Sequence, residues 1–202
     1  MTEITDEQHR QKMQRRQEIQ AQRVADRQLE KGLIIVNTGE GKGKTTAALG
    51  MVLRSLGHGY KVAIVQFIKG AWNPAEKAAF DRWGDQISFL ALGEGFTWET
   101  QDRNRDIAKA QEAWEIAITF IHNPEIKLVL LDEINIALKL GYLQVESILT
   151  ELAQKPDDSH IILTGRGAPS ELISVADLVT EMKLIKHPFR SQGVKAQPGI
   201  EF

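Results

Sequence analysis

Short runs of apolar, mostly β-branched residues alternate with longer segments of helical periodicity from residue 33 onward, and this alternation restricts the fold more than any other feature. Several runs are continuously apolar, as in Leu-Val-Leu-Leu at 128–131, which is typical of strands that are covered on both faces. Strands that alternate with helices form βαβ units, in which the strands run parallel. The sequence therefore predicts an α/β fold with a mostly parallel sheet of about six strands flanked by helices.

The expected strands are residues 33–37, 61–68, 87–92, 127–132, 160–163 and 178–184. The expected helices are residues 45–56, 103–121 and 145–153. We expect the first of these helices to end at Gly57 as its C′ glycine. The second stops before Asn123-Pro124, because the residue before a proline disfavours the α conformation. The segment 187–202 is punctuated by Gly and Pro, and we expect it to be irregular.

Residues 1–31 differ in composition from the rest of the chain. Lys, Arg, Asp, Glu and Gln dominate the segment, and Gly and Pro are absent from it, which favours a helix. Its apolar residues form no wide stripe, so the segment cannot bury much surface by itself. It is either a solvated helix or an arm that docks on a partner subunit or orders over a ligand. We expect a polar helical arm at 1–31 and one folded domain at 32–202.

Overall composition excludes several classes of function. Lys and Arg number 25 against 27 Asp and Glu, so the net charge of −2 provides no general attraction to nucleic acid or to an anionic membrane. The absence of cysteine excludes disulfides, thiolate metal sites and cysteine nucleophiles. No apolar run has the length of a signal peptide or a membrane span. We expect a soluble, cytoplasmic protein without nucleic-acid or membrane partners.

The strongest motif is the glycine-rich segment 38–46, Thr-Gly-Glu-Gly-Lys-Gly-Lys-Thr-Thr, which follows an apolar strand and opens a helix. This is the context of a P-loop, in which backbone N–H groups and the helix N-terminus surround phosphate oxygens. Lys44 supplies a positive charge to the phosphates, and the Thr45 hydroxyl can ligate Mg²⁺. The usual pattern begins with glycine, whereas this chain has Thr38 at that position. The residues expected to bind nucleotide are Gly39, Glu40, Gly41, Lys42, Gly43, Lys44, Thr45 and Thr46.

Two further motifs follow apolar strands whose carboxyl ends should lie beside this loop. The run 127–133 ends in Asp132 and Glu133, an arrangement typical of the Walker B acid that lies near the P-loop metal ion, and one of the two carboxylates should face that ion. The segment Thr-Gly-Arg-Gly at 164–167 places Arg166 where a guanidinium can neutralise polyphosphate charge. The structural alternatives are a helix-terminal acid and an ordinary salt bridge.

Phe96 and Trp98 lie between glycines in the loop after the strand at 87–92. Such aromatics either pack in the core or, near a nucleotide site, contact a base or a large apolar substrate. The histidines show no metal-ligand spacing, and no nucleophile stands out. The Asn-Lys-x-Asp element of guanine-specific GTPases is missing, so we expect ATP as the nucleotide.

Together, VNTGEGKGKTTAALG, GEGFTWETQDR, VLLDEIN, TGRGAP and GVKAQPGIEF closely resemble the P-loop type of bacterial ATP:corrinoid adenosyltransferase, over about residues 33–202. The resemblance implies a RecA-like fold and a homodimer that acts in corrinoid salvage or in de novo adenosylcobalamin synthesis. It implies that cobalt(I) of a reduced corrinoid attacks the 5′ carbon of ATP and that triphosphate leaves. It also implies an electron donor, such as flavodoxin, that would reduce the corrinoid.

The resemblance also implies roles for individual residues. The P-loop would bind the triphosphate in a reversed sense, and Lys44 and Arg166 would stabilise the departing charge. Mg²⁺ or Mn²⁺ would be held by Thr45 and Glu133, with Asp132 behind them. Phe96 and Trp98 match an aromatic pair beside the corrin ring that displaces the lower axial ligand, which makes reduction to cobalt(I) accessible. The arm at 1–31 resembles a segment that folds over the corrinoid.

Two other functions are compatible with the motifs. A RecA-like ATPase or small-molecule kinase would act at the γ-phosphate, with Glu133 as the base, and would release ADP. A non-catalytic nucleotide switch or corrinoid carrier would bind both ligands without turnover.

Overall fold

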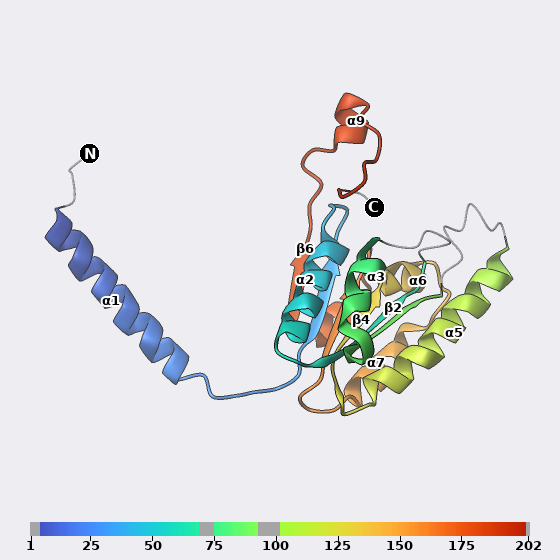
Figure 1. Cartoon of the computed structure of the whole chain (residues 1–202), viewed down its shortest axis with the longest axis horizontal. Coiled ribbons are helices and arrows are strands. Elements are labelled where there is room, and N and C mark those ends of the chain that lie inside the picture. Colours follow the sequence, from blue (N-terminus) through green and yellow to red (C-terminus); the bar gives the residue numbers. More distant parts are fainter. Residues whose placement is uncertain (1–4, 69–74, 93–101, 201–202) are drawn as a thin grey trace. The chain divides into compact units, whose positions relative to one another are not determined.

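The computed structural model describes residues 5–68, 75–92 and 102–200. The chain forms two compact units, Met1–Lys31 and Gly32–Phe202, each of which is described by itself (Figure 1). In the first unit, helix α1 spans Asp6–Ala25 and buries none of its residues. It begins with a capping box, in which the Thr5 hydroxyl accepts a hydrogen bond from the Gln8 N–H group and the Gln8 side chain accepts one from the Thr5 N–H group.

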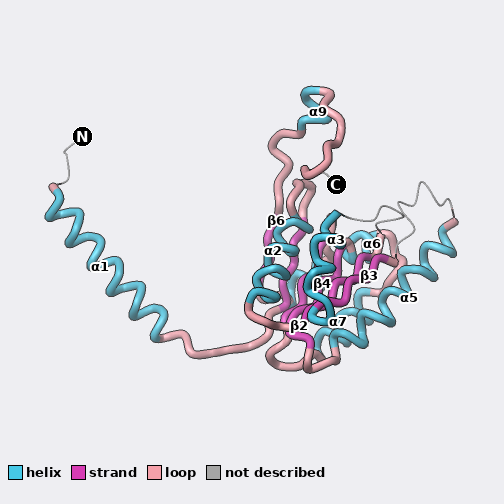
Figure 2. The backbone as a smooth tube through the Cα atoms, in the orientation of Figure 1, coloured by secondary structure: helices cyan, strands magenta, loops and turns pink. Residues whose placement is uncertain are grey.

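The second unit is built on one sheet, whose strands are magenta in Figure 2. Its six strands have the order β3-β2-β4-β5-β1-β6. All five pairings between neighbouring strands are parallel. The strands are β1 (Ile34–Thr38), β2 (Lys61–Gln66), β3 (Ile87–Ala91), β4 (Ile126–Asp132), β5 (His160–Thr164) and β6 (Leu178–Glu181). The prediction of an α/β fold with a mostly parallel sheet of about six strands flanked by helices is confirmed.

Two apolar cores cover the two faces of the sheet, because successive side chains of a strand point to opposite faces. On one face, Ile64, Leu130 and Ile162 of the central strands pack with Leu49 and Val52 of α2 (Lys44–Gly57). On the other face, the alternate residues of the same strands pack with α5 (Arg103–Ile121), α6 (Ile134–Lys139), α7 (Val145–Ala153) and α8 (Ser170–Val175). The site described below lies on the face that α2 covers.

Several boundaries differ from the sequence prediction. Strands β2, β3 and β6 end at Gln66, Ala91 and Glu181, before the apolar runs themselves end. The short helices α3 (Ala75–Phe80), η1 (Asp81–Gln86), α6 and α8 were not expected, since runs of about six residues show little periodicity. The carboxyl-terminal segment is not wholly irregular, because α9 (Pro188–Gln192) lies within it. The left-handed residue after α2 is Gly59 rather than Gly57, which lies in the helix itself.

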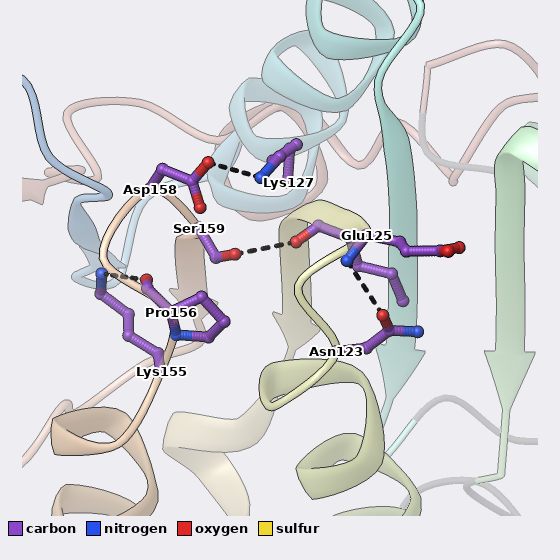
Figure 3. A network of polar contacts seen from close by, with 8 residues as sticks. Asn123, Glu125, Lys127, Lys155, Pro156, Asp158 and Ser159 are labelled. Atoms are coloured by element: carbon purple, nitrogen blue, oxygen red, sulfur yellow. Dashed lines mark hydrogen bonds and ion pairs between the residues drawn. The ribbon is translucent and has the colours of Figure 1, made fainter.

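Polar contacts close the amino end of the sheet (Figure 3). The buried Ser159 hydroxyl donates to the Ile126 carbonyl oxygen at 2.9 Å, and the partly exposed side chain of Lys127 pairs with the largely exposed side chain of Asp158 at 2.5 Å. Asn123 accepts a hydrogen bond from the Glu125 N–H group. The contacts of Ser159 and Asp158 connect the turn before β5 with the first residues of β4. They stabilise the end of the sheet opposite the glycine-rich loop.

Candidate functional site

The glycine-rich loop connects β1 to α2 at the carboxyl end of the sheet. Gly39 and Gly43 have φ angles of 94° and 102°, which residues with a side chain rarely adopt. The Gly41 N–H group donates to the Met182 carbonyl oxygen at 2.6 Å. A Cβ atom on Gly39 or Gly41 would lie 2.5 or 2.7 Å from that same oxygen. The loop therefore needs glycine for its backbone angles and for its close approach to the segment after β6.

Thr38, which replaces the usual first glycine of the motif, is the last residue of β1 and is 8% exposed. Its backbone oxygen accepts a hydrogen bond from the Met182 N–H group at 2.9 Å. Its hydroxyl oxygen accepts one from the Ala168 N–H group at 3.2 Å. A threonine fits here because the position belongs to a strand with ordinary backbone angles, and its hydroxyl ties the glycine-rich loop to the loop after β5.

Lys44 lies at the start of α2 and is 7% exposed. Its Nζ atom donates to the carbonyl oxygens of Gly39 at 2.8 Å and Gly41 at 2.5 Å, inside the curve of the loop. Burial lowers the pKa of Lys44, while the nearby carboxylate of Glu133 acts in the opposite direction. The lysine is thus held where a phosphate oxygen can replace the loop carbonyls as its acceptor.

Asp132 ends β4, is fully buried, and accepts hydrogen bonds from three elements. Its Oδ1 atom accepts from the Thr45 hydroxyl at 2.8 Å and from the Thr164 hydroxyl at 2.7 Å. Its Oδ2 atom accepts from the Gln66 side-chain amide at 2.8 Å. Because the Thr45 hydroxyl gives its proton to Asp132, its oxygen lone pairs are available to a ligand in the adjoining cavity.

Glu133 directly follows Asp132 and adopts φ 63°, the only positive φ of a residue other than glycine among the described residues. Its N–H group donates to the Thr164 hydroxyl at 2.9 Å. Its Oε2 atom would lie 3.1 Å from a Cβ atom on Gly165, whose own φ is 127°. A left-handed backbone costs about 1 to 3 kcal/mol and is concentrated at functional sites, because surrounding contacts must enforce it.

Arg166 and Glu40 face each other across the opening of the loop, with 3.5 Å between Arg166 Nε and Glu40 Oε2. Both side chains are largely exposed, so the pair is weak and can open for a ligand. The cavity beside them measures about 540 Å³. It is lined by residues 41–46 of the loop and α2, Ala75, Glu76 and Ala79 of α3, Glu133, Arg166, and Gly199 and Ile200.

The structure thus brings together the predicted residues of the loop, the acidic pair and Arg166. Phe96 and Trp98 lie outside the described residues. Sequence reasoning missed Gln66, Thr164, Glu76 and the wall formed by Gly199 and Ile200. Gln66 and Thr164 had a usable signal in the sequence. Each is a polar residue two positions after an apolar residue that points to the same face of its strand.

That signal becomes a row of polar side chains when the strands are placed in register. Gln66 pairs with Asp132 between β2 and β4, and Asn37 pairs with Thr164 between β1 and β5. The residues two positions earlier on these strands, Ile35, Ile64, Leu130 and Ile162, all belong to the core against α2. The row therefore lies on the α2 face, directly beyond the apolar core.

The donor set fits a hard divalent cation, which prefers oxygen ligands. Thr45 contributes a hydroxyl, Glu133 a carboxylate at the cavity, and Asp132 a buried carboxylate that orients the hydroxyl. No group of three or more His, Cys, Asp or Glu side chains suited to a metal ion occurs among the residues that the structure describes. A cation here would depend on phosphate oxygens and water for its remaining ligands.

A glycine-rich loop between a strand and a helix, a buried acid on a nearby strand and a cavity with cationic lining define a nucleotide-binding protein of the P-loop class. Residues 30–202 match the sequence model of the family described as ATP:corrinoid adenosyltransferase BtuR/CobO/CobP, and residues 1–24 match that of the cob(I)alamin adenosyltransferase N-terminal region. The chain belongs to the ATP:corrinoid adenosyltransferase family.

Curated relatives support this assignment over nearly the whole chain. It is 49% identical to a corrinoid adenosyltransferase of Pseudomonas aeruginosa over 98% of this chain and 97% of the relative. It is 52% identical to one from a Sinorhizobium species over 99% and 94% of the two chains. The enzyme of Escherichia coli K12 is 42% identical over 98% of this chain and 100% of its own length.

Among solved structures, the type III secretion ATPase EscN of enteropathogenic E. coli aligns with a TM-score of 0.44 and 16% identity. The alignment covers 74% of this chain and 42% of that one. In the described part of the chain, no helix combines the length and the apolar character needed to cross a membrane.

Proposed function

We propose that the cavity at the glycine-rich loop binds ATP through its triphosphate and presents the 5′ carbon of its ribose to a reduced corrinoid. As a member of its family the chain is an ATP-dependent corrinoid adenosyltransferase of cobalamin synthesis. In the reaction, cobalt(I) donates an electron pair to the 5′ carbon and the cobalt–carbon bond forms. The bond between the carbon and the α-phosphate oxygen breaks, and triphosphate leaves with that bond's electron pair.

The observation that carries the proposal is the excess of positive charge in the cavity lining, where three cationic side chains outnumber the carboxylates of Glu76 and Glu133. Lys42, Lys44 and Arg166 surround the same cavity as the N-terminus of α2. These groups bind the anion and stabilise the charge that develops on the leaving oxygen, which is electrostatic catalysis by groups already in place. The Arg166–Glu40 pair opens when the phosphates bind, because they compete with Glu40 for the guanidinium.

We assign the divalent cation, Mg²⁺ or Mn²⁺, to Thr45 and Glu133, with Asp132 accepting the Thr45 proton. When bound, the cation neutralises part of the triphosphate charge. The assignment is supported by the burial of Asp132 and by the direction of the Thr45 hydrogen bond. The other six residues of the loop, Gly39 to Gly43 and Thr46, bind the phosphates in this proposal.

Phe96 and Trp98 keep the role proposed from the sequence, which is to face the corrin ring and displace the axial ligand of cobalt(II). The division into an arm at 1–31 and an adenosyltransferase domain at 32–202 is likewise proposed. In this proposal the protein is a homodimer, and the arm covers the corrinoid. The support is that α1 buries none of its residues and exposes Ile19 and Val24, and that Leu29, which follows the helix, is exposed as well. In this proposal an external electron donor such as flavodoxin reduces the cobalt(II) of the bound corrinoid to cobalt(I).

Product analysis tests the proposed reaction. The protein is incubated anaerobically with ATP, Mg²⁺ and chemically reduced cobalamin, and the absorbance spectrum and the phosphate products are recorded. We expect the spectrum of a cobalt–carbon bond together with one triphosphate per adenosyl group. ADP and inorganic phosphate as the products would favour a kinase or an ATPase instead.

Trp98→Ala separates the aromatic role from ATP binding. We expect unchanged ATP affinity and a larger loss of rate with a cobalt(II) substrate and reductant than with prereduced cobalt(I). Equal losses on the two substrates would contradict the axial-ligand role. Sedimentation velocity of the full chain tests whether the protein is a dimer. The same measurement on a chain that begins at residue 32 tests whether the arm contributes to dimer formation.

A further inference from the structure

Gln66 belongs to the polar row, and the function proposed above assigns it no role. It ends β2 with 1% of its surface exposed, in direct register with Asp132 on β4. Its backbone is fixed on both sides, since its carbonyl oxygen accepts from the Leu92 N–H group and the next residue, Phe67, donates to the Asp132 carbonyl oxygen. An apolar residue would be the ordinary choice at this depth, as at Val62 and Ile64 earlier in the same stripe.

The two ends of the Gln66 amide have different surroundings. Nε2 donates to Asp132 Oδ2 at 2.8 Å. Oε1 is buried and has no hydrogen-bond partner among the described residues. A buried amide oxygen without a partner costs about 1 to 3 kcal/mol. Its presence beside the Asp132 carboxylate, which accepts the hydrogen bond of Thr45 at the cavity, indicates an acceptor that is satisfied only when a ligand or water binds.

The contacts of Asp132 show what Gln66 controls. The carboxylate is held from one side by Gln66 through Oδ2 and from the other by Thr45 and Thr164 through Oδ1. Without the Gln66 hydrogen bond the carboxylate can rotate about its Cβ–Cγ bond. The Thr45 hydroxyl would then lose the fixed acceptor that directs its oxygen toward the cavity.

We propose that Gln66 is a positioning residue of the divalent-cation site: it fixes the Asp132 carboxylate through Nε2 and supplies Oε1 as the acceptor for a water of the cation's hydration shell. The inference rests on the cation site proposed above. It explains why a buried glutamine occurs at the carboxyl end of an otherwise apolar stripe. Removing a hydrogen-bond partner of a metal-site residue lowers metal affinity about 10- to 100-fold in other proteins, which sets the expected size of the effect.

The test measures the cation directly, with the full-length protein, ATP and Mn²⁺ in the absence of corrinoid, so that no turnover occurs. Electron paramagnetic resonance reports free Mn²⁺, and calorimetry in EDTA reports ATP affinity without a cation. For Gln66→Met, which keeps the chain length and removes both polar atoms, we expect the Mn²⁺ dissociation constant to rise about tenfold. The ATP affinity in EDTA should change less than about twofold, because Gln66 does not line the cavity.

Ser159→Ala is the matched control, because Ser159 is a fully buried polar side chain whose hydrogen bond to Ile126 lies at the opposite end of the sheet. It should lower stability and leave Mn²⁺ affinity unchanged. If Gln66→Met behaves like Ser159→Ala, the glutamine has only a structural role and the proposal is wrong. If the wild-type protein with ATP binds no Mn²⁺, the cation site itself is wrong, which is a separate outcome.

A double-mutant cycle tests whether Gln66 acts through Asp132. In an Asp132→Asn background, Gln66→Met should change Mn²⁺ affinity less than about twofold, because the hydrogen bond that it removes is already altered. Additive effects in the cycle would overturn the proposed route. If Gln66→Met does not fold, Gln66→Asn carries the test, since its amide is one methylene too short to keep the contact with Asp132. A wild-type Mn²⁺ affinity in Gln66→Asn would also overturn the proposal.

Discussion

The two ends of the parallel sheet are built from the same strands but satisfy their polar groups in different ways. At the amino end, the Ser159 hydroxyl donates to the Ile126 carbonyl oxygen, and the pair of Lys127 and Asp158 reaches solvent (Figure 3). His160 Nδ1 accepts a hydrogen bond from the Leu33 N–H group. At the carboxyl end, Asp132 is fully buried, Glu133 has a left-handed backbone, and the side-chain oxygens of Gln66 and Asn135 are buried without a partner among the described residues.

This difference separates polar groups that stabilise the fold from polar groups that await a ligand. A hydrogen bond that is complete in the empty protein contributes to folding, whereas a buried acceptor without a partner lowers stability until something binds. The carboxyl end combines such acceptors with backbone strain and the glycine-rich loop. Substitutions at the two ends should therefore divide into those that change ATP binding and those that change only stability.

The largest expected difference in ATP affinity is between variants of two lysines. Lys44→Ala should weaken ATP binding by about 100-fold, because it removes the two hydrogen bonds that Lys44 would donate to phosphate oxygens. Charge-assisted hydrogen bonds are worth about 1.5 kcal/mol each at the low end. Lys61→Ala at the amino end should leave it unchanged, since Lys61 pairs with Glu125 on the surface. Calorimetric titration with ATP measures both variants. Retained affinity in Lys44→Ala would remove the assignment of the loop as the phosphate site.

Two glycines give the next comparison. A Cβ atom on Gly32 would lie 2.0 Å from the Ser159 carbonyl oxygen, and one on Gly165 would lie 3.1 Å from Glu133 Oε2 at a φ of 127°. Alanine at either position should lower the free energy of unfolding by about 1 to 3 kcal/mol. Only Gly165→Ala should also weaken ATP binding in the presence of Mg²⁺, because it displaces Glu133. Urea denaturation measures the stability of both variants, and calorimetric titration measures their ATP affinity. Equal ATP affinities in the two variants would contradict a role of Gly165 in positioning Glu133 at the site.

A residue at either end of the sheet could be predicted from the sequence only where a local pattern along the chain identifies it. The loop at 38–46, the acidic pair and Arg166 were predictable, because local patterns after apolar strands place them at one edge of a parallel sheet. The helix at Arg103–Ile121 was predicted with its observed bounds, since its apolar period is long and it stops before Asn123-Pro124.

Gln66 and Thr164 were not found, because their meaning depends on strand register. Gln66 becomes part of the site only when β2 and β4 pair so that it lies opposite Asp132, 66 positions away in the sequence. The contact of the glycine-rich loop with Met182 likewise joins segments that no local pattern connects. Strand order and register are properties of the whole sheet, so residue spacing along one strand does not determine them.

His160 gives a smaller, pH-dependent effect at the amino end. Its Nδ1 atom accepts a hydrogen bond from the Leu33 N–H group at 3.1 Å, and burial, with a lesser effect of Lys155, lowers its pKa below the ordinary value of 6.5. The native state therefore favours the neutral ring, and the unfolded state binds more protons between the lowered pKa and 6.5. The contribution to stability is full above pH 6.5 and is lost as the pH falls through this window.

Urea midpoints at pH 7.5 and pH 5.5 measure this contribution. We expect the decrease on acidification to be smaller in His160→Gln, whose amide oxygen can still accept the Leu33 hydrogen bond but does not titrate. ATP affinity measured at pH 7.5 should be the same in both proteins. An identical decrease in the wild type and the variant would show that another group causes the pH dependence.

The smallest expected effect belongs to the exposed pair of Lys127 and Asp158. The hydrogen bond from Lys127 lowers the pKa of Asp158, so the pair contributes above the ordinary carboxyl pKa of 3.8 and its contribution is lost as the pH falls through the lowered value. Because both side chains reach solvent, the attraction is screened and offset by the entropy of ordering the lysine. Lys127→Ala should therefore shift the urea midpoint at pH 7.5 by little more than replicate scatter and leave ATP affinity unchanged. A change in ATP affinity would mean that the two ends are coupled through β4, since Lys127 and Asp132 lie on the same strand.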